Sequence, residues 1–281
     1  ANSSIIMEYC EGGDLHRRIE SLAAVAGEDD YRPPSEAMQW IGQIFLALEH
    51  LHLKLQTLVR DLKPQNVVLT HGRAKLTDFG HGRIGARAPG DFTLHCGPPG
   101  SPHFVAPEVV RRRPYDWKVD LYSFGVLVWV VLTGGLLETP ALPPCNHMSG
   151  DHDFEALSTN CKLLDQCIRE ASRAGARELP SADSVSFVQA LTHENPNRRP
   201  AHEKIRVHPF MKSLRLPPAT ARSDVIEQWL AGKTPNTMSM QTSETCTPHD
   251  AVVGGGESYV SSDEFHLERA GLLSGLRSAG S

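Results

Sequence analysis

The stretch Leu58-Val-Arg-Asp-Leu-Lys-Pro-Gln-Asn-Val-Val-Leu69 decides how the rest of the chain is interpreted. It places a carboxylate (Asp61), an ammonium group (Lys63) and a carboxamide (Asn66) in one short loop, and Pro64 restricts the backbone between them. The β-branched apolar run that follows predicts a strand. A carboxylate that can accept a proton, a cation for a phosphate and an oxygen ligand for a metal ion together indicate phosphoryl transfer.

The composition is that of an ordinary globular protein. The 281 residues are 40% hydrophobic and 22% charged, enough for a sizeable core. A net charge of −5 and a pI near 6.3 lack the basic excess typical of nucleic-acid binding, so no nucleic-acid partner is expected. The longest apolar run, Phe124 to Leu132, is far shorter than the roughly 20 residues that span a bilayer. It predicts a buried helix and no membrane span.

The six cysteines are scattered without a C-x-x-C pair, and no secretory leader opens the chain. We therefore expect an intracellular, cytoplasmic setting. The cysteines and histidines between residues 145 and 167 have spacings that fit no standard zinc site, which favours a variable insert around a helix at residues 154–174.

The opening stretch resembles the catalytic loop of eukaryotic-type protein kinases, H-R-D-x-x-x-x-N. Arg60, Asp61 and Asn66 match that pattern, Val59 replaces its histidine, and Lys63-Pro64 resembles the serine/threonine branch. The resemblance implies that Asp61 orients the substrate hydroxyl and accepts its proton, and that Lys63 neutralises the γ-phosphoryl group of ATP. The family's histidine is a packing residue, so an apolar valine can fill its space while losing a polar tether.

A β-hairpin is predicted directly after this loop. Two short strands, residues 66–70 and 74–77, flank the turn His71-Gly72, and Asp78-Phe79-Gly80 follows the second strand. In kinases the aspartate of D-F-G chelates the magnesium ion that bridges the nucleotide phosphates. The resemblance therefore assigns Asp78 and the amide oxygen of Asn66 as Mg²⁺ ligands, and Mg²⁺ prefers such hard oxygen donors.

The beginning of the chain predicts a strand, a turn and a helix. Ile5–Tyr9 is an apolar run expected to form a short buried strand, Cys10–Gly13 a turn, and the residues from Asp14 a helix. This order resembles the kinase hinge between the small and large lobes. The resemblance assigns the ATP contacts to Met7 as gatekeeper, to the backbone of Glu8 and Cys10, to Asp14 near the ribose, and to Val68.

Residues 82–104 are rich in Gly, Pro and polar residues and resemble an activation segment. Thr93 is its candidate phosphorylation site, since a phosphate there could pair with Arg60; the alternative is a solvated loop threonine. Ser101 stands where the family usually has a threonine that contacts the catalytic aspartate and lysine.

Three charged residues further on match structural positions of the kinase large lobe. Glu108 ends an A-P-E motif, and Asp120 lies in a predicted hydrophobic helix that runs to Thr133. By resemblance, Asp120 caps the backbone of the catalytic loop, and Arg199 forms a buried ion pair with Glu108.

We therefore expect an α+β, protein-kinase-like fold with a mainly helical large lobe and a short catalytic β-hairpin. The small-lobe sheet is expected to be absent except for its last strand. Residues 1–10 are assigned to that strand and the hinge, 11–216 to the large lobe, and 217–281 to a largely disordered tail with a short helix at 223–230.

The resulting hypothesis is a serine/threonine protein kinase that uses ATP and Mg²⁺ on a protein substrate. The chain starts in mid-pattern without a Met, so we expect a truncated front and little activity from these 281 residues alone. The alternative is a kinase-derived binding scaffold without catalysis. Retention of Asp61, Lys63, Asn66 and Asp78 favours the enzyme, because a scaffold needs none of them.

Overall fold

The structure is a computed structural model, and it describes residues 5–26, 31–84, 102–111, 113–134 and 181–231. Residues 10–233 belong to one compact unit and Ile5–Tyr9 to another, so each is described by itself. Several predictions fall outside the described residues: Thr93, Ser101, the Cys and His residues between 145 and 167, and the helix at 154–174.

The core of residues 10–233 is built around α4 (Lys118–Thr133), which is buried on all sides. Its sequence is apolar all round, as a helix without a solvent-facing side requires. The carboxylate of Asp116 accepts a hydrogen bond from the Lys118 amide (2.9 Å) where the helix begins, and Gly134 ends it in the left-handed conformation. The predicted buried helix entered by an acid is confirmed.

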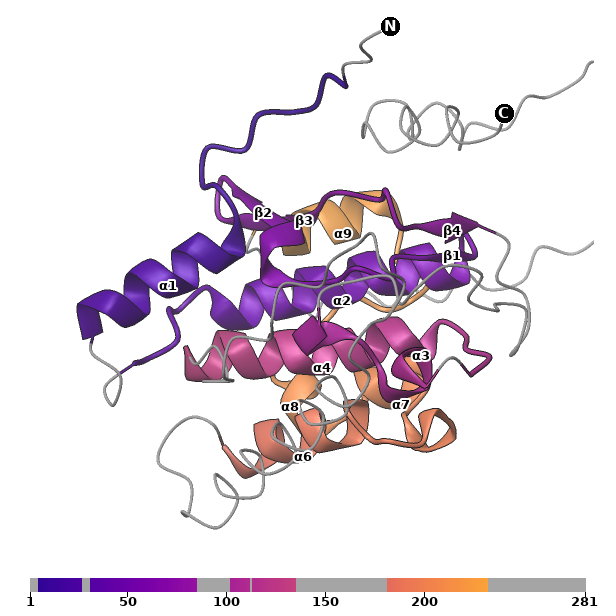
Figure 1. The fold of residues 1–281 in the computed structure, drawn as a ribbon. Helices are drawn as coiled ribbons and strands as arrows, with labels where there is room; N and C mark the ends of the chain where they lie inside the picture. The colour runs from indigo at the N-terminus through magenta and orange to yellow at the C-terminus, as the bar shows by residue number, and fades with distance from the viewer. Residues whose placement is uncertain (1–4, 27–30, 85–101, 112, 135–180, 232–281) are drawn as a thin grey trace, which may run out of the picture. The chain divides into compact units, whose positions relative to one another are not determined.

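A second core helix, α2 (Ala37–Leu53), packs against both α4 and β3 (Arg73–Leu76), as Figure 1 shows. In the sequence, the apolar residues from Met38 to Leu51 recur at three- and four-residue steps, which predicts a core helix, and the structure confirms it. In the sequence, Pro33-Pro34-Ser35 predicts a helix start with Ser35 as its N-cap, and this N-cap is wrong. The Ala37 amide bonds to the Pro34 carbonyl in a preceding turn, and the Ser35 hydroxyl donates to Glu36 instead of to the helix.

The predicted hairpin is present and carries the end of the opening stretch. β2 (Val67–Thr70) pairs antiparallel with β3, with Val67 opposite Leu76 and Thr70 opposite Arg73. A second, unpredicted pair joins β1 (Thr57–Leu58) to β4 (Arg83–Ile84). The chain therefore returns, after the D-F-G sequence, to the segment that precedes the catalytic loop.

The other helical segments of the described residues are α1 (Leu15–Ala26), η1 (Pro64–Asn66), η2 (Pro102–Phe104), α3 (Pro107–Val110), α6 (Ala182–Leu191), η3 (Pro196–Arg198), α7 (His202–Arg206), α8 (Pro209–Lys212) and α9 (Ser223–Leu230). α6 packs on α4, and α8 on α6. The helix predicted at 223–230 is confirmed as α9. Its Trp229 is buried against Gly42 of α2, and the indole N–H donates to the Leu214 carbonyl (3.3 Å).

The strand predicted at Ile5–Tyr9 is not formed. Ile6 is 95% exposed and Tyr9 83% exposed. A β-strand is stabilised by hydrogen bonds to a neighbouring strand, and no strand of the described residues pairs with this segment. Apolar composition alone therefore does not bury it. The described part of the chain is helix-rich with few strands, which fits the large-lobe part of the predicted fold.

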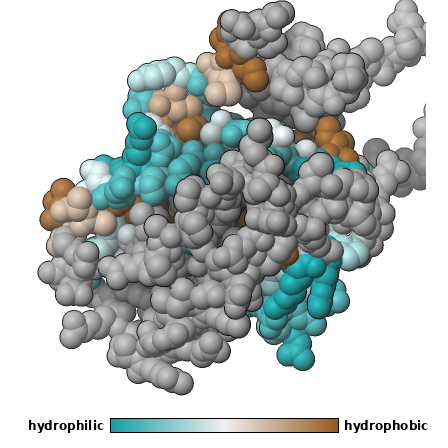
Figure 2. All heavy atoms as spheres, viewed as in Figure 1, coloured by the Kyte–Doolittle hydropathy of each residue, from teal (hydrophilic) through white to brown (hydrophobic). Residues whose placement is uncertain are grey.

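Among the described residues visible in Figure 2, hydrophobic side chains occur in a few separate places, and most of the other described residues are hydrophilic. Within the described ranges, no helix has both the length and the apolar character needed to cross a membrane.

Candidate active site

The predicted catalytic carboxylate is buried at the start of the loop between β1 and β2. Asp61 is 6% exposed, and its Oδ2 lies 2.9 Å from the ammonium of Lys63. The Asn66 amide nitrogen donates to the same Oδ2 (3.0 Å) and to the Asp61 carbonyl (2.8 Å). Because Pro64 begins the short 3₁₀ helix η1, the loop turns back and brings all three polar groups together. The structure thus gathers Asp61, Lys63 and Asn66 into one cluster.

A buried carboxylate from α4 holds the backbone of this loop. Asp120 is fully buried, and its two oxygens accept hydrogen bonds from the amides of Val59 and Arg60, each at 2.8 Å. Arg60 has a positive φ of 65°, which is uncommon outside glycine, so the loop conformation needs such external support. The contact that the resemblance assigns to Asp120 is present. Val59 is buried and packs in the core.

The two proposed magnesium ligands lie at the same end of the hairpin. Asn66 immediately precedes β2, Asp78 follows β3, and the amide of Thr77 donates to the Asn66 carbonyl (3.0 Å). The amide nitrogen of Asn66 is engaged by Asp61, which leaves the amide oxygen as the atom suited to a cation. Asp78 is exposed and adopts a positive φ of 56°, with its Oδ1 accepting from the Gly80 amide (3.1 Å).

These donors suit Mg²⁺ chemically, because Mg²⁺ takes hard oxygen ligands and needs few of them from the protein. Among the described residues, no cluster of three or more His, Cys, Asp or Glu could hold a metal ion. A pair consisting of one carboxylate and one amide oxygen therefore matches a cation that is also bound by the phosphates of a nucleotide.

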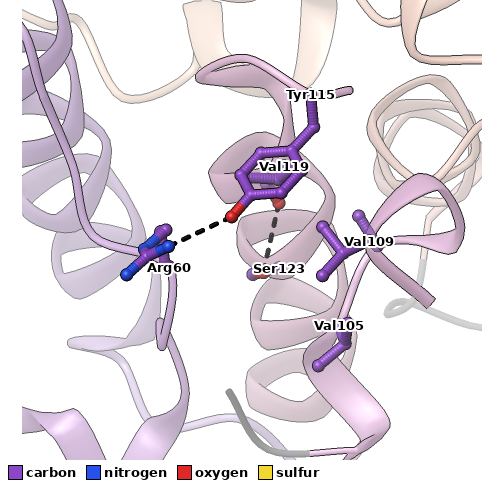
Figure 3. A pocket seen from close by; sticks show the side chains of 7 residues that line it. Arg60, Val105, Val109, Tyr115, Val119 and Ser123 are labelled. Atoms are coloured by element: carbon purple, nitrogen blue, oxygen red, sulfur yellow. Dashed lines mark hydrogen bonds between the residues drawn. The ribbon is translucent and has the colours of Figure 1, made fainter. Parts of the chain in front are cut away.

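Arg60 connects the catalytic loop to two other segments. Its Nε donates to the carbonyl of His81 (2.6 Å), just after the D-F-G sequence, and its Nη1 donates to the hydroxyl of Tyr115 (3.1 Å). Figure 3 shows the Tyr115 ring directed toward Arg60, with Val105 and Val109 across a small pocket. The guanidinium is therefore placed by contacts on both sides.

A buried ion pair joins α3 to the segment before α7. The guanidinium of Arg199 meets the carboxylate of Glu108 in a bidentate arrangement, at 2.5 and 2.8 Å, and both side chains are almost completely buried. Arg199 also donates to the carbonyls of His193 (2.9 Å) and Lys118 (3.0 Å). The predicted contact between these two residues is present.

Of the residues assigned to ATP, the structure brings Asp14 and Val68 side by side. They form an isolated antiparallel bridge, flanked by the bonds from Gly12 N to Leu69 O (2.9 Å) and from Leu69 N to Gly13 O (2.8 Å). The Asp14 carboxylate caps α1 by accepting from the Arg17 amide (2.9 Å).

Cys10 belongs to the compact unit of residues 10–233, as Asp14 and Val68 do, and is half-buried. Met7 and Glu8 belong to the other unit and are exposed.

Glu11 connects the turn at residues 10–13 to the hairpin. Its carboxylate accepts from the His71 amide (2.5 Å) and from the Thr70 hydroxyl (2.7 Å). The bond from the His71 amide, followed by that from Thr70, lowers the pKa of Glu11 to about 2. The charged carboxylate thus holds residues 10–13 beside the end of β2.

Sequence reasoning missed several residues that shape the site. His52 lies between Asp120 and His202, and Tyr115 contacts Arg60. Tyr115 lies seven residues after the A-P-E glutamate and carried no distinguishing pattern. A histidine within the apolar end of α2 was a weak signal for a buried polar contact.

A comparison with protein families matches residues 1–211 to the protein kinase domain. Serine/threonine-protein kinase Nek3 of Mus musculus is 33% identical over 201 residues, which cover 70% of this chain and 34% of that protein. Serine/threonine-protein kinase Nek5 of Homo sapiens is 30% identical over 212 residues, 75% of this chain and 26% of that protein.

A RAC family serine/threonine-protein kinase homolog of Dictyostelium discoideum is 31% identical over 213 residues, which cover 74% of this chain and 41% of that protein. The alignments thus span between about a quarter and two fifths of the length of these three relatives.

Proposed function

Because the chain belongs to the protein kinase family, we propose that it transfers the γ-phosphoryl group of ATP to a serine or threonine hydroxyl of a protein substrate. The observation that carries this proposal is the buried cluster in which Asp61 is held by Lys63 and Asn66. The serine/threonine preference is supported by the Lys63-Pro64 pair and by the kinase names of the relatives.

In this mechanism Asp61 is the group that orients the attacking hydroxyl and takes its proton. Its contacts with Lys63 and Asn66 restrict the carboxylate to one orientation, which is what a positioned base requires. The Lys63 side chain is 21% exposed, so its ammonium is accessible to a phosphoryl oxygen. From one position, Lys63 can therefore orient the Asp61 carboxylate and contact a phosphoryl oxygen.

Asn66 and Asp78 would hold Mg²⁺ at the open end of the hairpin. When bound, the ion neutralises charge on the nucleotide phosphates. The β2–β3 pairing brings together residues that are 12 apart in the chain, and the Asp61 contacts orient the Asn66 amide.

The ATP contacts of Met7, Glu8, Cys10, Asp14 and Val68 remain proposals. The placement of Asp14 beside Val68 supports a shared nucleotide-facing edge for these two residues. Four other points also stay predictions. They are Thr93 as a phosphorylation site, Ser101 as a contact of Asp61 and Lys63, the domain boundaries at residues 10 and 216, and the low activity of the 281 residues alone.

The test is phosphoryl transfer from γ-labelled ATP to a general protein substrate such as casein, measured with the natural polypeptide expressed from its full coding sequence. Asp61→Asn is expected to reduce the rate about 10²- to 10⁴-fold. Asp224→Asn is the matched control, because Asp224 is an exposed carboxylate of α9 that pairs only with Arg222 among the described residues. Transfer by the Asp61→Asn variant at the control rate would refute the proposal, and no transfer by any variant would favour a binding scaffold.

A further inference from the structure

A chain of buried hydrogen bonds runs from α7 to the catalytic loop. The Nε2 atom of His202 lies 3.0 Å from Nδ1 of His52, and Nε2 of His52 lies 2.8 Å from Oδ2 of Asp120. Asp120 in turn accepts from the amides of Val59 and Arg60. His202 is 2% exposed, and the side chains of His52 and Asp120 are fully buried. Residues 150 positions apart in sequence are thereby connected.

The positions of the protons follow from the chemistry of these groups. An ionised carboxylate only accepts hydrogen bonds, so His52 must donate to Asp120 through Nε2. A neutral His52 then presents a bare Nδ1, which requires a donor, and Nε2–H of His202 is within reach of it. The hydrogen bond made by one ring nitrogen fixes the protonation of the other. His202 thus selects the His52 tautomer that can donate to Asp120.

The surroundings keep this chain away from water. The His202 ring lies against Trp117, with ring centroids 4.6 Å apart, and near Phe45 at 6.2 Å. Arg206 on the same helix acts electrostatically on His202, and its guanidinium forms an ion pair with Glu49 of α2. Bulk water is therefore a poor substitute for His202 as the donor to His52.

We propose that His202 is a positioning residue for phosphoryl transfer: through His52 and Asp120 it holds the amides of Val59 and Arg60, and with them Asp61, in place. The inference rests on the proposed function for its catalytic meaning. The loop has particular need of such support, since Val59 lacks the polar side chain that the catalytic-loop pattern has there and Arg60 adopts a positive φ.

Two variants separate the hydrogen bond from packing. His202→Phe keeps an aromatic ring against Trp117 and Phe45 but offers no donor to His52. His202→Gln carries an amide N–H₂ at a position similar to Nε2 of the imidazole and can still donate. If His202 were merely a packing residue, the phenylalanine variant would be the better tolerated of the two.

The experiment is nuclear magnetic resonance on the 281-residue chain. Hydrogen exchange is followed at the amides of Val59 and Arg60, with the Leu127 amide inside α4 as an internal control, and ¹⁵N shifts report the His52 tautomer. His202→Phe is expected to speed exchange at the two loop amides about tenfold and to change the His52 tautomer, with the Leu127 amide unchanged. His202→Gln should remain within about threefold of the parent protein.

The proposal is overturned if His202→Phe leaves the loop amides and the tautomer unchanged, or if it accelerates all three amides equally. It is also overturned if His52 of the unmodified chain carries its proton on Nδ1 rather than Nε2, a result that needs no variant to fold. None of these measurements requires phosphoryl transfer, so a failure of the proposed kinase activity is recognised separately.

Discussion

Removal of the charge from Glu108 should destabilise the protein strongly, because it leaves the Arg199 guanidinium buried without a counter-ion. The Arg199 side chain has no exposed area, and Glu108 supplies both of its carboxylate contacts. Glu108→Gln keeps the shape of the side chain and removes only the charge. Besides the uncharged amide oxygen of the glutamine, what remains around Arg199 is two carbonyl contacts and the face of the Tyr122 ring, 5.1 Å away.

Breaking a buried ion pair on one side costs about 3–5 kcal/mol. The carbonyls of His193 and Lys118 and the Tyr122 ring partly replace the lost carboxylate, so we expect a loss near the lower end, about 3 kcal/mol. That loss corresponds to a decrease of roughly 150-fold in the ratio of folded to unfolded protein. For a domain with a total stability of about 5–15 kcal/mol this is a large fraction.

The double variant Glu108→Leu/Arg199→Met removes both charges and fills the space with apolar atoms. Replacing a whole buried pair in this way is often close to neutral. We therefore expect the double variant to be more stable than Glu108→Gln, although it carries the larger chemical change. A double variant that is more stable than the single variant is the result expected only if the single variant leaves a buried charge unpaired.

The assay is urea unfolding followed by tryptophan fluorescence, with the free energy of unfolding taken from the midpoint and slope. Glu194→Gln is the matched control, because Glu194 forms an ion pair with Arg111 at the surface and its loss should change stability by less than about 1 kcal/mol. A cost below about 1 kcal/mol for Glu108→Gln, or a double variant less stable than Glu108→Gln, would refute the reasoning.

Three further predictions concern acid sensitivity and the packing of α9. Burial lowers the pKa of His202 to about 3, so between about pH 6.5 and 3 the unfolded chain binds a proton that the folded chain does not bind. Stability should therefore fall as the pH drops through this window, by at most about 1.4 kcal/mol per pH unit, and urea titrations should show a shallower fall for His202→Gln. The Glu11 contact should persist until about pH 2, so the His71 amide shift should titrate near that pH, and a midpoint near 4.5 would contradict it. Trp229→Ala should cost about 3–4 kcal/mol in urea unfolding, because the indole fills the space over Gly42, and a loss below 1 kcal/mol would show that α9 is only loosely attached.

The long elements were predictable from local sequence. The three- and four-residue spacing of apolar side chains predicted α2, and uninterrupted apolarity predicted α4. The short strand-forming runs on either side of the His71-Gly72 turn predicted the hairpin. These patterns show whether one face of a helix or strand, or all of its faces, will be buried, and residues close together in the sequence are enough to show this. The same approach failed for Ile5–Tyr9, since an apolar run becomes a strand only when another strand pairs with it.

Sequence order alone determined the composition of the candidate site, because Asp61, Lys63 and Asn66 lie within six residues of one another and the hairpin necessarily returns the chain to Asp78. Only the tertiary structure decided what holds that site in place. The contacts from Asp120 and His202 come from helices far along the chain, and no spacing encodes them, because they depend on how α2, α4 and α7 pack. Local pattern thus specifies the reacting groups, whereas their support depends on the packed core.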